Sequence, residues 1–154
     1  MIKFILKCFV PFLLTLISIY VYWKANSFTN TANLLEIINA IHDRTNAILA
    51  VERKDKELDM WNDSNIVKDE TFFEKVDSRK KLIVEERDAA IYSLLNVYEF
   101  ACIQYIKNKI NKEAFKSIFS GSLKSIKDEY KIYFIGDGLQ ENYEAINRVY
   151  KEWN

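Results

Sequence analysis

Residues that break helices are almost absent from this chain. Its 154 residues include three glycines and one proline, and 49% of its residues are apolar. Tight turns, β-hairpins and glycine-rich nucleotide loops need glycine or proline at fixed positions. The composition therefore predicts an all-α fold. The length allows one domain and a membrane anchor, but not two separate cores.

One apolar segment, residues 4–23, lies at the N-terminus. It reads FILKCFVPFLLTLISIYVYW, and twelve of its twenty residues are Leu, Ile, Val or Phe. Twenty helical residues span about 30 Å, the thickness of a hydrocarbon core. The twelve apolar side chains favour insertion by roughly 4–7 kcal/mol. Tyr20, Tyr22 and Trp23 are placed to form an aromatic belt at the interface. We expect residues 1–24 to form a transmembrane anchor.

A cleaved signal peptide is the alternative interpretation of this segment. Cleavage after Ala25 would put Trp23 where a small residue is required, so we favour an uncleaved signal-anchor. Lys3 and Lys7 precede most of the apolar run. By the positive-inside rule they favour a cytoplasmic N-terminus, with the domain on the opposite side of the membrane.

The rest of the chain predicts a compact helical bundle of about four helices over residues 32–154. We interpret the polar residues 25–31 as a linker before it. The first helix carries an apolar stripe with spacings of three and four, typical of one buried face. The stripe consists of Leu34, Leu35, Ile38, Ile41, His42, Thr45, Ile48 and Leu49. Because His42 has no partners at ligand spacing, we expect a hydrogen-bonded structural histidine.

The later helices follow from the same periodicity. We expect a break near 61–65, a short helix at about 70–76 and a long helix at about 78–110. A further helix starts at the N-cap Asn111, and Gly121 within it suggests close packing against a neighbour. Asp137 and Gln140 resemble a capping box before the last helix. The stripe of that helix is expected to dock into the core; it consists of Tyr143, Ile146, Tyr150 and Trp153.

A narrow polar stripe interrupts the most apolar of these helices. Ser93, Asn96 and Glu99 follow one another at a spacing of three. A buried carboxylate needs a partner, and Asn96 is placed one turn before Glu99 to share hydrogen bonds. We interpret the three residues as a buried polar clamp that fixes helix register. The alternative is an enzyme centred on Glu99, but the sequence offers no second acid, nucleophile or metal set around it.

Charge and cysteine usage narrow the function classes. Residues 25–154 contain 19 basic and 22 acidic residues, whereas nucleic-acid-binding domains usually have a basic excess. We therefore expect no nucleic-acid partner. Cys8 and Cys102 lie in apolar stretches and match neither a disulfide framework nor a metal motif. We expect no catalytic, cofactor-binding or metal-binding residues, and no cofactor.

A locally basic face is predicted over residues 107–131, from the end of the long helix into the helix that follows it. Lysines outnumber the acids Glu113, Asp128 and Glu129 in this stretch. Ordinary solvation explains such a run, and the alternative is contact with lipid headgroups or an acidic partner. The face consists of Lys107, Lys109, Lys112, Lys116, Lys124, Lys127 and Lys131.

Two segments resemble a known family. The first, residues 94–130, reads LLNVYEFACIQYIKNKINKEAFKSIFSGSLKSIKDEY. It is similar to the Leu-Asn-x-x-Glu helix and the following helix of the domain of unknown function 4760. The second, YEAINRVYKEW at residues 143–153, is similar to the C-terminal helix of that family. Between them, KIYFIGDG at residues 131–138 departs from the family, whose members tend to carry an arginine there.

The resemblance implies a small bacterial protein with an N-terminal membrane helix and a helical domain. It marks Asn96 and Glu99 as signature positions and implies no activity. Combined with the charge pattern, it places a single-pass protein in a bacterial inner membrane with its domain in the periplasm.

Three functional hypotheses follow. The one we favour is a membrane-tethered helical interaction module without catalytic activity, which contacts membrane lipid and either a protein partner or further copies of itself. The second is phage defence or superinfection exclusion at the inner membrane, since small anchored proteins of AT-rich composition suit a mobile element. The third is the enzyme using Glu99.

Overall fold

The protein is all-α in the residues that its computed structural model describes. These are residues 2–64, 70–135 and 143–154, with side chains described from residue 17 onward apart from Trp23 and Glu70. Four α-helices, one 3₁₀ helix and no strand occur in these ranges, so the predicted fold class is confirmed. The helices are α1 (Ile2–Ser64), α2 (Glu70–Ile106), α3 (Lys112–Glu129), η1 (Lys131–Phe134) and α4 (Glu144–Trp153).

Helix α1 is a single helix of 63 residues. The segment that we interpreted as a linker, residues 25–31, is helical and continues it. Its hydroxyl groups bond within the helix: those of Thr29 and Thr31 each donate, at 3.0 Å, to a carbonyl oxygen four residues earlier. No glycine and no proline follows Pro11 within α1, so nothing in the backbone chemistry ends the helix here.

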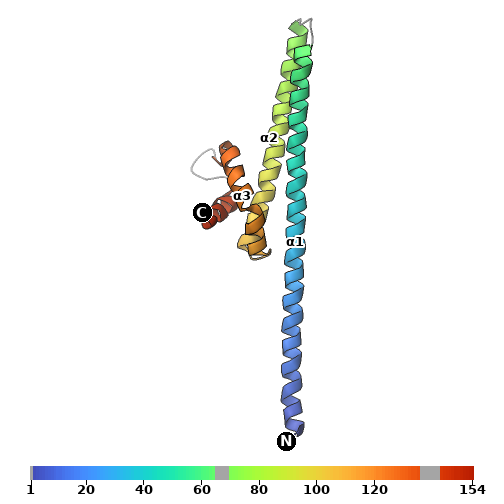
Figure 1. The fold of residues 1–154 in the computed structure, drawn as a ribbon, viewed down its shortest axis with the longest axis vertical. Coiled ribbons are helices and arrows are strands. Elements are labelled where there is room, and N and C mark those ends of the chain that lie inside the picture. Colours follow the sequence, from blue (N-terminus) through green and yellow to red (C-terminus); the bar gives the residue numbers. More distant parts are fainter. Residues whose placement is uncertain (1, 65–69, 136–142) are drawn as a thin grey trace.

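Figure 1 shows an elongated molecule built on a long hairpin. Helices α1 and α2 run antiparallel side by side, while α3 and α4 pack against the end of α2 that is nearer the N-terminus of α1. The first part of α1 extends alone below this bundle. The bundle is therefore confined to the middle of the molecule, and the compact domain expected from the sequence is longer and more open than predicted.

The core lies where α1 to α4 meet. Leu95, Phe115, Leu123, Ile146 and Val149 are fully buried there. Two of these five belong to α4, a helix of only ten residues. The prediction that the C-terminal helix docks into the core is confirmed.

The helix boundaries differ from prediction around α2. The helices expected at 70–76 and 78–110 are one helix, because no glycine or proline lies between them. Helix α2 ends at Ile106, where the Lys109 nitrogen donates to the Gln104 carbonyl oxygen at 2.9 Å and Asn108 adopts a left-handed φ of 56°. This is a Schellman-type end. The predicted N-cap Asn111 is confirmed, since its side chain accepts from the Ala114 nitrogen.

Several burial predictions are wrong. Leu35 is 58% exposed, and Leu49 and His42 are exposed as well, because α1 has neighbours on only part of its circumference and the apolar stripe is wider than that contact. His42 is hydrogen-bonded, as expected, with Nε2 3.0 Å from the amide nitrogen of Asn46. Gly121 does not mark a close approach, since nothing lies within 4 Å of a Cβ built on it. The predicted capping box at Asp137 and Gln140 lies outside the described residues.

Within the described residues, none of the helices has the length and apolar character needed to cross a membrane. Residues 1–16 of the predicted anchor lie outside the described side chains. The transmembrane assignment of residues 1–24 stays a prediction.

Candidate functional site

Glu99 holds the start of α4. One carboxylate oxygen accepts from the backbone nitrogen of Ala145 at 2.9 Å, and the other accepts from that of Ile146 at 3.0 Å. The residue at the N-cap position, Tyr143, has a left-handed φ of 60° and makes no side-chain capping bond. Glu99 therefore caps α4 from another helix, and its negative charge lies at the positive end of the α4 dipole.

Ser93 and Asn96 do not join Glu99 in one clamp. Asn96 is exposed, and both residues line a groove of about 450 Å³ between α2 and α1. Arg44 of α1 and Phe100 of α2 lie on the same groove. Side chains three residues apart on a helix point in directions that differ by 60°, so the predicted stripe diverges. Ser93 and Asn96 point towards α1, whereas Glu99 points towards α4. The partner of Glu99 was invisible in the sequence because it is main chain from a remote segment.

Cys102 lies one turn after Glu99 and is fully buried. Burial, together with the negative charge of Glu99, raises the pKa of the Cys102 thiol to about 12. A thiol with such a pKa stays protonated at neutral pH and is a poor nucleophile. In this environment Cys102 acts as a small side chain of the core.

The predicted basic face is divided by the fold. The Lys127 ammonium donates to the side-chain oxygen of Asn147 at 2.5 Å and lies 4.7 Å from the centre of the Tyr150 ring, so it ties α3 to α4. Lys112 lies 4.7 Å from the ring centre of Tyr105. Both ammonium groups are engaged internally. The lysines of the face that are exposed are Lys107, Lys109, Lys116, Lys124 and Lys131.

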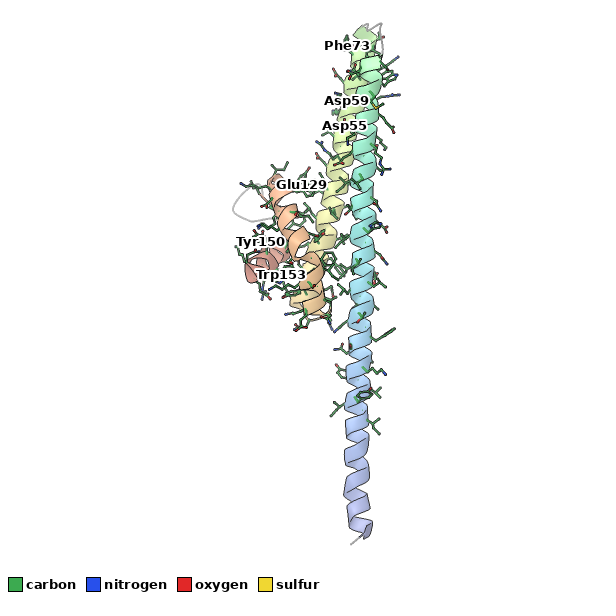
Figure 2. All side chains as sticks on the ribbon, viewed as in Figure 1. Asp55, Asp59, Phe73, Glu129, Tyr150 and Trp153 are labelled. Carbon is green, nitrogen blue, oxygen red and sulfur yellow. The ribbon has the colours of Figure 1, made fainter. Side chains whose placement is uncertain are left out.

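An aromatic cluster closes the bundle at the C-terminal end of α4. Trp153 packs edge-on against Tyr105 at 5.4 Å and donates from its ring nitrogen to the Tyr105 hydroxyl at 3.1 Å. That hydroxyl donates in turn to Glu152 at 2.7 Å. Figure 2 shows Trp153 and Tyr150 on this helix. The sequence predicted the apolar contribution of Trp153, but not the polar chain that orients it.

Beyond the bundle, α1 and α2 continue as a two-helix arm, which we define as residues 51–64 and 70–86 (Figure 1). Its inner seam is thin, and the buried residues in it are Val51, Leu58 and Val76. Two exposed ion pairs bridge the helices, Lys54 with Glu86 at 2.6 Å and Lys80 with Asp59 at 3.0 Å. Pairs this exposed stabilise a fold only weakly.

The arm carries large apolar side chains on its outer surface. Met60, Phe73, Leu82 and Val84 are between 45% and 70% exposed. Phe73 is labelled near the tip in Figure 2, with Asp55 and Asp59 further down the arm. Near the tip, the ring centres of Trp61 and Phe72 are 4.8 Å apart. The guanidinium of Arg79 lies 5.5 Å from the Trp61 ring centre.

Comparisons with protein-family models, with curated proteins and with solved structures find no match to this chain. The resemblance to the domain of unknown function 4760 therefore stays a prediction.

The described side chains offer binding surfaces more plainly than a reaction centre. Within the three described ranges, no group of three or more His, Cys, Asp or Glu side chains could hold a metal ion. The one carboxylate singled out by the sequence, Glu99, has both oxygens engaged by main-chain donors. The arm, by contrast, has aromatic, methionine and arginine side chains together at its end, and these residue types are enriched at protein interfaces.

Proposed function

We propose that the protein is a membrane-tethered interaction module whose arm presents an apolar tip to a protein partner. The observation that carries this proposal is the exposed apolar surface of the arm. Met60 and Phe73 are 70% and 50% exposed, and they lie in the arm, whose residues 51–64 and 70–86 contribute no side chain to the core of the bundle. Solvent contact with such side chains is unfavourable, and burying them against a partner removes that cost.

The continuity of α1 supports the same proposal. The apolar segment at residues 4–23 and the α1 part of the tip, residues 60–64, belong to one helix. At 1.5 Å per residue, the forty residues from Ala25 to Ser64 extend about 60 Å. A chain anchored through residues 1–24 would hold its tip at that distance from the membrane, beyond the reach of lipid headgroups. A protein partner is therefore the occupant that we propose for the tip.

The tip also has the composition of an interaction hot spot. Phe72 and Arg79 each pack on Trp61, and the exposed Phe73 packs on Phe72. Met60, next to Trp61 in the sequence, is exposed as well. Tryptophan and arginine that are already packed in place lose little conformational entropy when a partner binds. The partner is either another protein or a second copy of this chain, and one experiment separates the two.

Site-specific photocrosslinking in the native membrane tests the role of the arm. A photoreactive residue at Met60 or Phe73 should give a discrete adduct of defined mass. The matched control positions are Ile132 on η1 and Ile118 on α3, which are 74% and 49% exposed but lie outside the arm. They should give little adduct. Mass spectrometry of the adduct distinguishes a second copy from a different protein. Equal labelling at all four positions would contradict the proposal.

The anchor is tested separately on the full-length chain. We expect the uncleaved protein to sediment with membranes, to resist extraction by alkaline carbonate and to be released by detergent, because insertion of residues 4–23 favours lipid by several kcal/mol. Recovery of intact protein in the soluble fraction without detergent would refute the tether and leave the crosslinking result to be judged on its own.

A further inference from the structure

The turn between α2 and α3, residues 107–111, faces the N-terminal end of α1 (Figure 1). A hydrogen bond places the turn at the level of Asn33 along the axis of α1: the side-chain nitrogen of Asn33 donates to the carbonyl oxygen of Lys109 at 3.2 Å. The turn is itself held by the bonds that end α2, with Asn108 in the left-handed conformation. Two exposed lysines, Lys107 and Lys109, therefore occupy a defined level beside α1.

We propose that Lys107 and Lys109 bind the phosphate groups of anionic lipids at the membrane surface. This inference rests on the proposed anchor at residues 1–24. Trp23 ends the apolar segment, and Asn33 lies ten residues later in the same helix, about 15 Å along its axis. The headgroup layer fills roughly 5–8 Å of that height. The remaining distance between the headgroup layer and the turn is comparable with the Debye length of about 8–10 Å. Extended lysine side chains and a tilt of the helix shorten this distance further.

The charges between the turn and the proposed interface favour this contact. The stretch of α1 from Lys24 to Asn33 contains one lysine and no acidic residue. Lys112, held against the Tyr105 ring, adds a fixed positive charge next to the turn. The acids on the elements around the turn include Glu113 at the start of α3, Glu36 on α1 and Glu152 on α4, which accepts from the Tyr105 hydroxyl. Residues 107–112 themselves contain three lysines and no acidic residue, so this segment carries a positive charge that can face anionic lipid.

The fold also separates this pair from Lys124 and Lys131, two of the other exposed lysines of the predicted basic face. Helix α3 runs away from the N-terminal end of α1 (Figure 1). Lys124 lies twelve residues beyond Lys112, up to about 18 Å farther along the helix, and Lys131 lies farther still. Both are beyond a Debye length from the turn. The structure thus divides a run of lysines that looks uniform in the sequence into near and far members.

Lysine footprinting on the full chain tests the proposal. The protein is placed in nanodiscs of phosphatidylcholine alone, or of equal parts phosphatidylcholine and phosphatidylglycerol, and acetylated briefly before mass spectrometry. We expect Lys107 and Lys109 to react at about one third of the rate, or more slowly still, in the anionic discs, because headgroup phosphates cover their ammonium groups. Lys124 and Lys131 should react equally in both discs. About 1 M salt, where the Debye length is near 3 Å, should abolish the difference.

Three outcomes would overturn the proposal. Equal reactivity of Lys107 and Lys109 in both discs shows that the turn does not contact lipid. Equal slowing of Lys124 and Lys131 shows a general field instead of a facing surface. Protection by inorganic phosphate added to phosphatidylcholine discs shows an anion site independent of the membrane. A chain that fails to enter either type of disc instead refutes the anchor, so failure of the proposed function is recognised separately.

Discussion

At the scale of single residues, Glu99 illustrates how a side chain acquires its role from the fold. Its two oxygens satisfy the Ala145 and Ile146 nitrogens, which would otherwise be unpaired at the start of a short helix. Tyr143 cannot supply this cap. Asn96, the neighbour expected to share its hydrogen bonds, instead lines the groove between α1 and α2. The sequence indicated that Glu99 needs a partner, and tertiary packing decided which one.

Replacing Glu99 by Gln should destabilise the protein by roughly 1.5–3 kcal/mol, because the charged capping bonds are lost and the new amide group faces a backbone donor. Thermal unfolding followed by circular dichroism measures the effect. Asn96→Ala is the matched control one turn away, and since Asn96 is exposed it should change stability by less than about 0.5 kcal/mol. A Glu99→Gln protein as stable as the parent would refute the capping role and revive the catalytic hypothesis.

At the scale of elements, the bundle and the arm are held together differently. The bundle buries side chains from all four helices around Leu95 and Ile146. The arm has one thin seam, with Leu58 and Val76 as buried members and exposed ion pairs on its surface. Elements with few buried contacts open locally at a lower free energy than the rest of the fold. The arm is therefore the part of the hairpin that a partner can stabilise most.

Amide hydrogen exchange should reveal this difference. We expect backbone amides in 53–62 and 74–84 to exchange faster than those in 94–104 and 115–125, because the arm opens without unfolding the bundle. Leu58→Ala should accelerate exchange in the arm further, since it removes a side chain that is 95% buried, while leaving the bundle unchanged. Equal exchange in the arm and the bundle would show that they unfold as one unit.

At the scale of the whole molecule, buried weak acids couple stability to alkaline pH. Burial raises the pKa of Tyr98 to about 12, and burial with the charge of Glu99 raises that of Cys102 to about 12. Their ordinary values are 10.0 and 9.0. The folded protein therefore keeps protons that the unfolded chain releases. This contribution to stability is complete below about pH 9 and is lost as pH rises towards 12.

We accordingly expect the unfolding temperature to fall between about pH 8 and pH 11, and to fall less steeply in Tyr98→Phe. The comparison uses the pH dependence, not the absolute stability, because Tyr98→Phe also removes a hydrogen bond with Ser122. A parent protein whose unfolding temperature is constant over this range would show that Tyr98 and Cys102 release their protons without cost in the folded state.

How far the sequence could predict this protein follows from the range of its interactions. The helices, the N-cap at Asn111 and the apolar stripe that includes Ile146 depend on residues within a few positions of one another, and periodicity reveals them. The faces that remain exposed, such as the side of α1 carrying Leu35, depend on where other helices happen to end. Periodicity contains no information on that, which is why the stripe of α1 was predicted too wide.

By itself the sequence determined an all-helical chain, because residues that rarely break a helix leave few other choices for a backbone that must pair its hydrogen bonds. Only the tertiary structure decided that Glu99 caps α4, that Lys127 and Lys112 are engaged internally, and that Lys107 and Lys109 lie level with Asn33. These are contacts between segments far apart in the chain, and they are fixed when the helices pack and not when each helix forms.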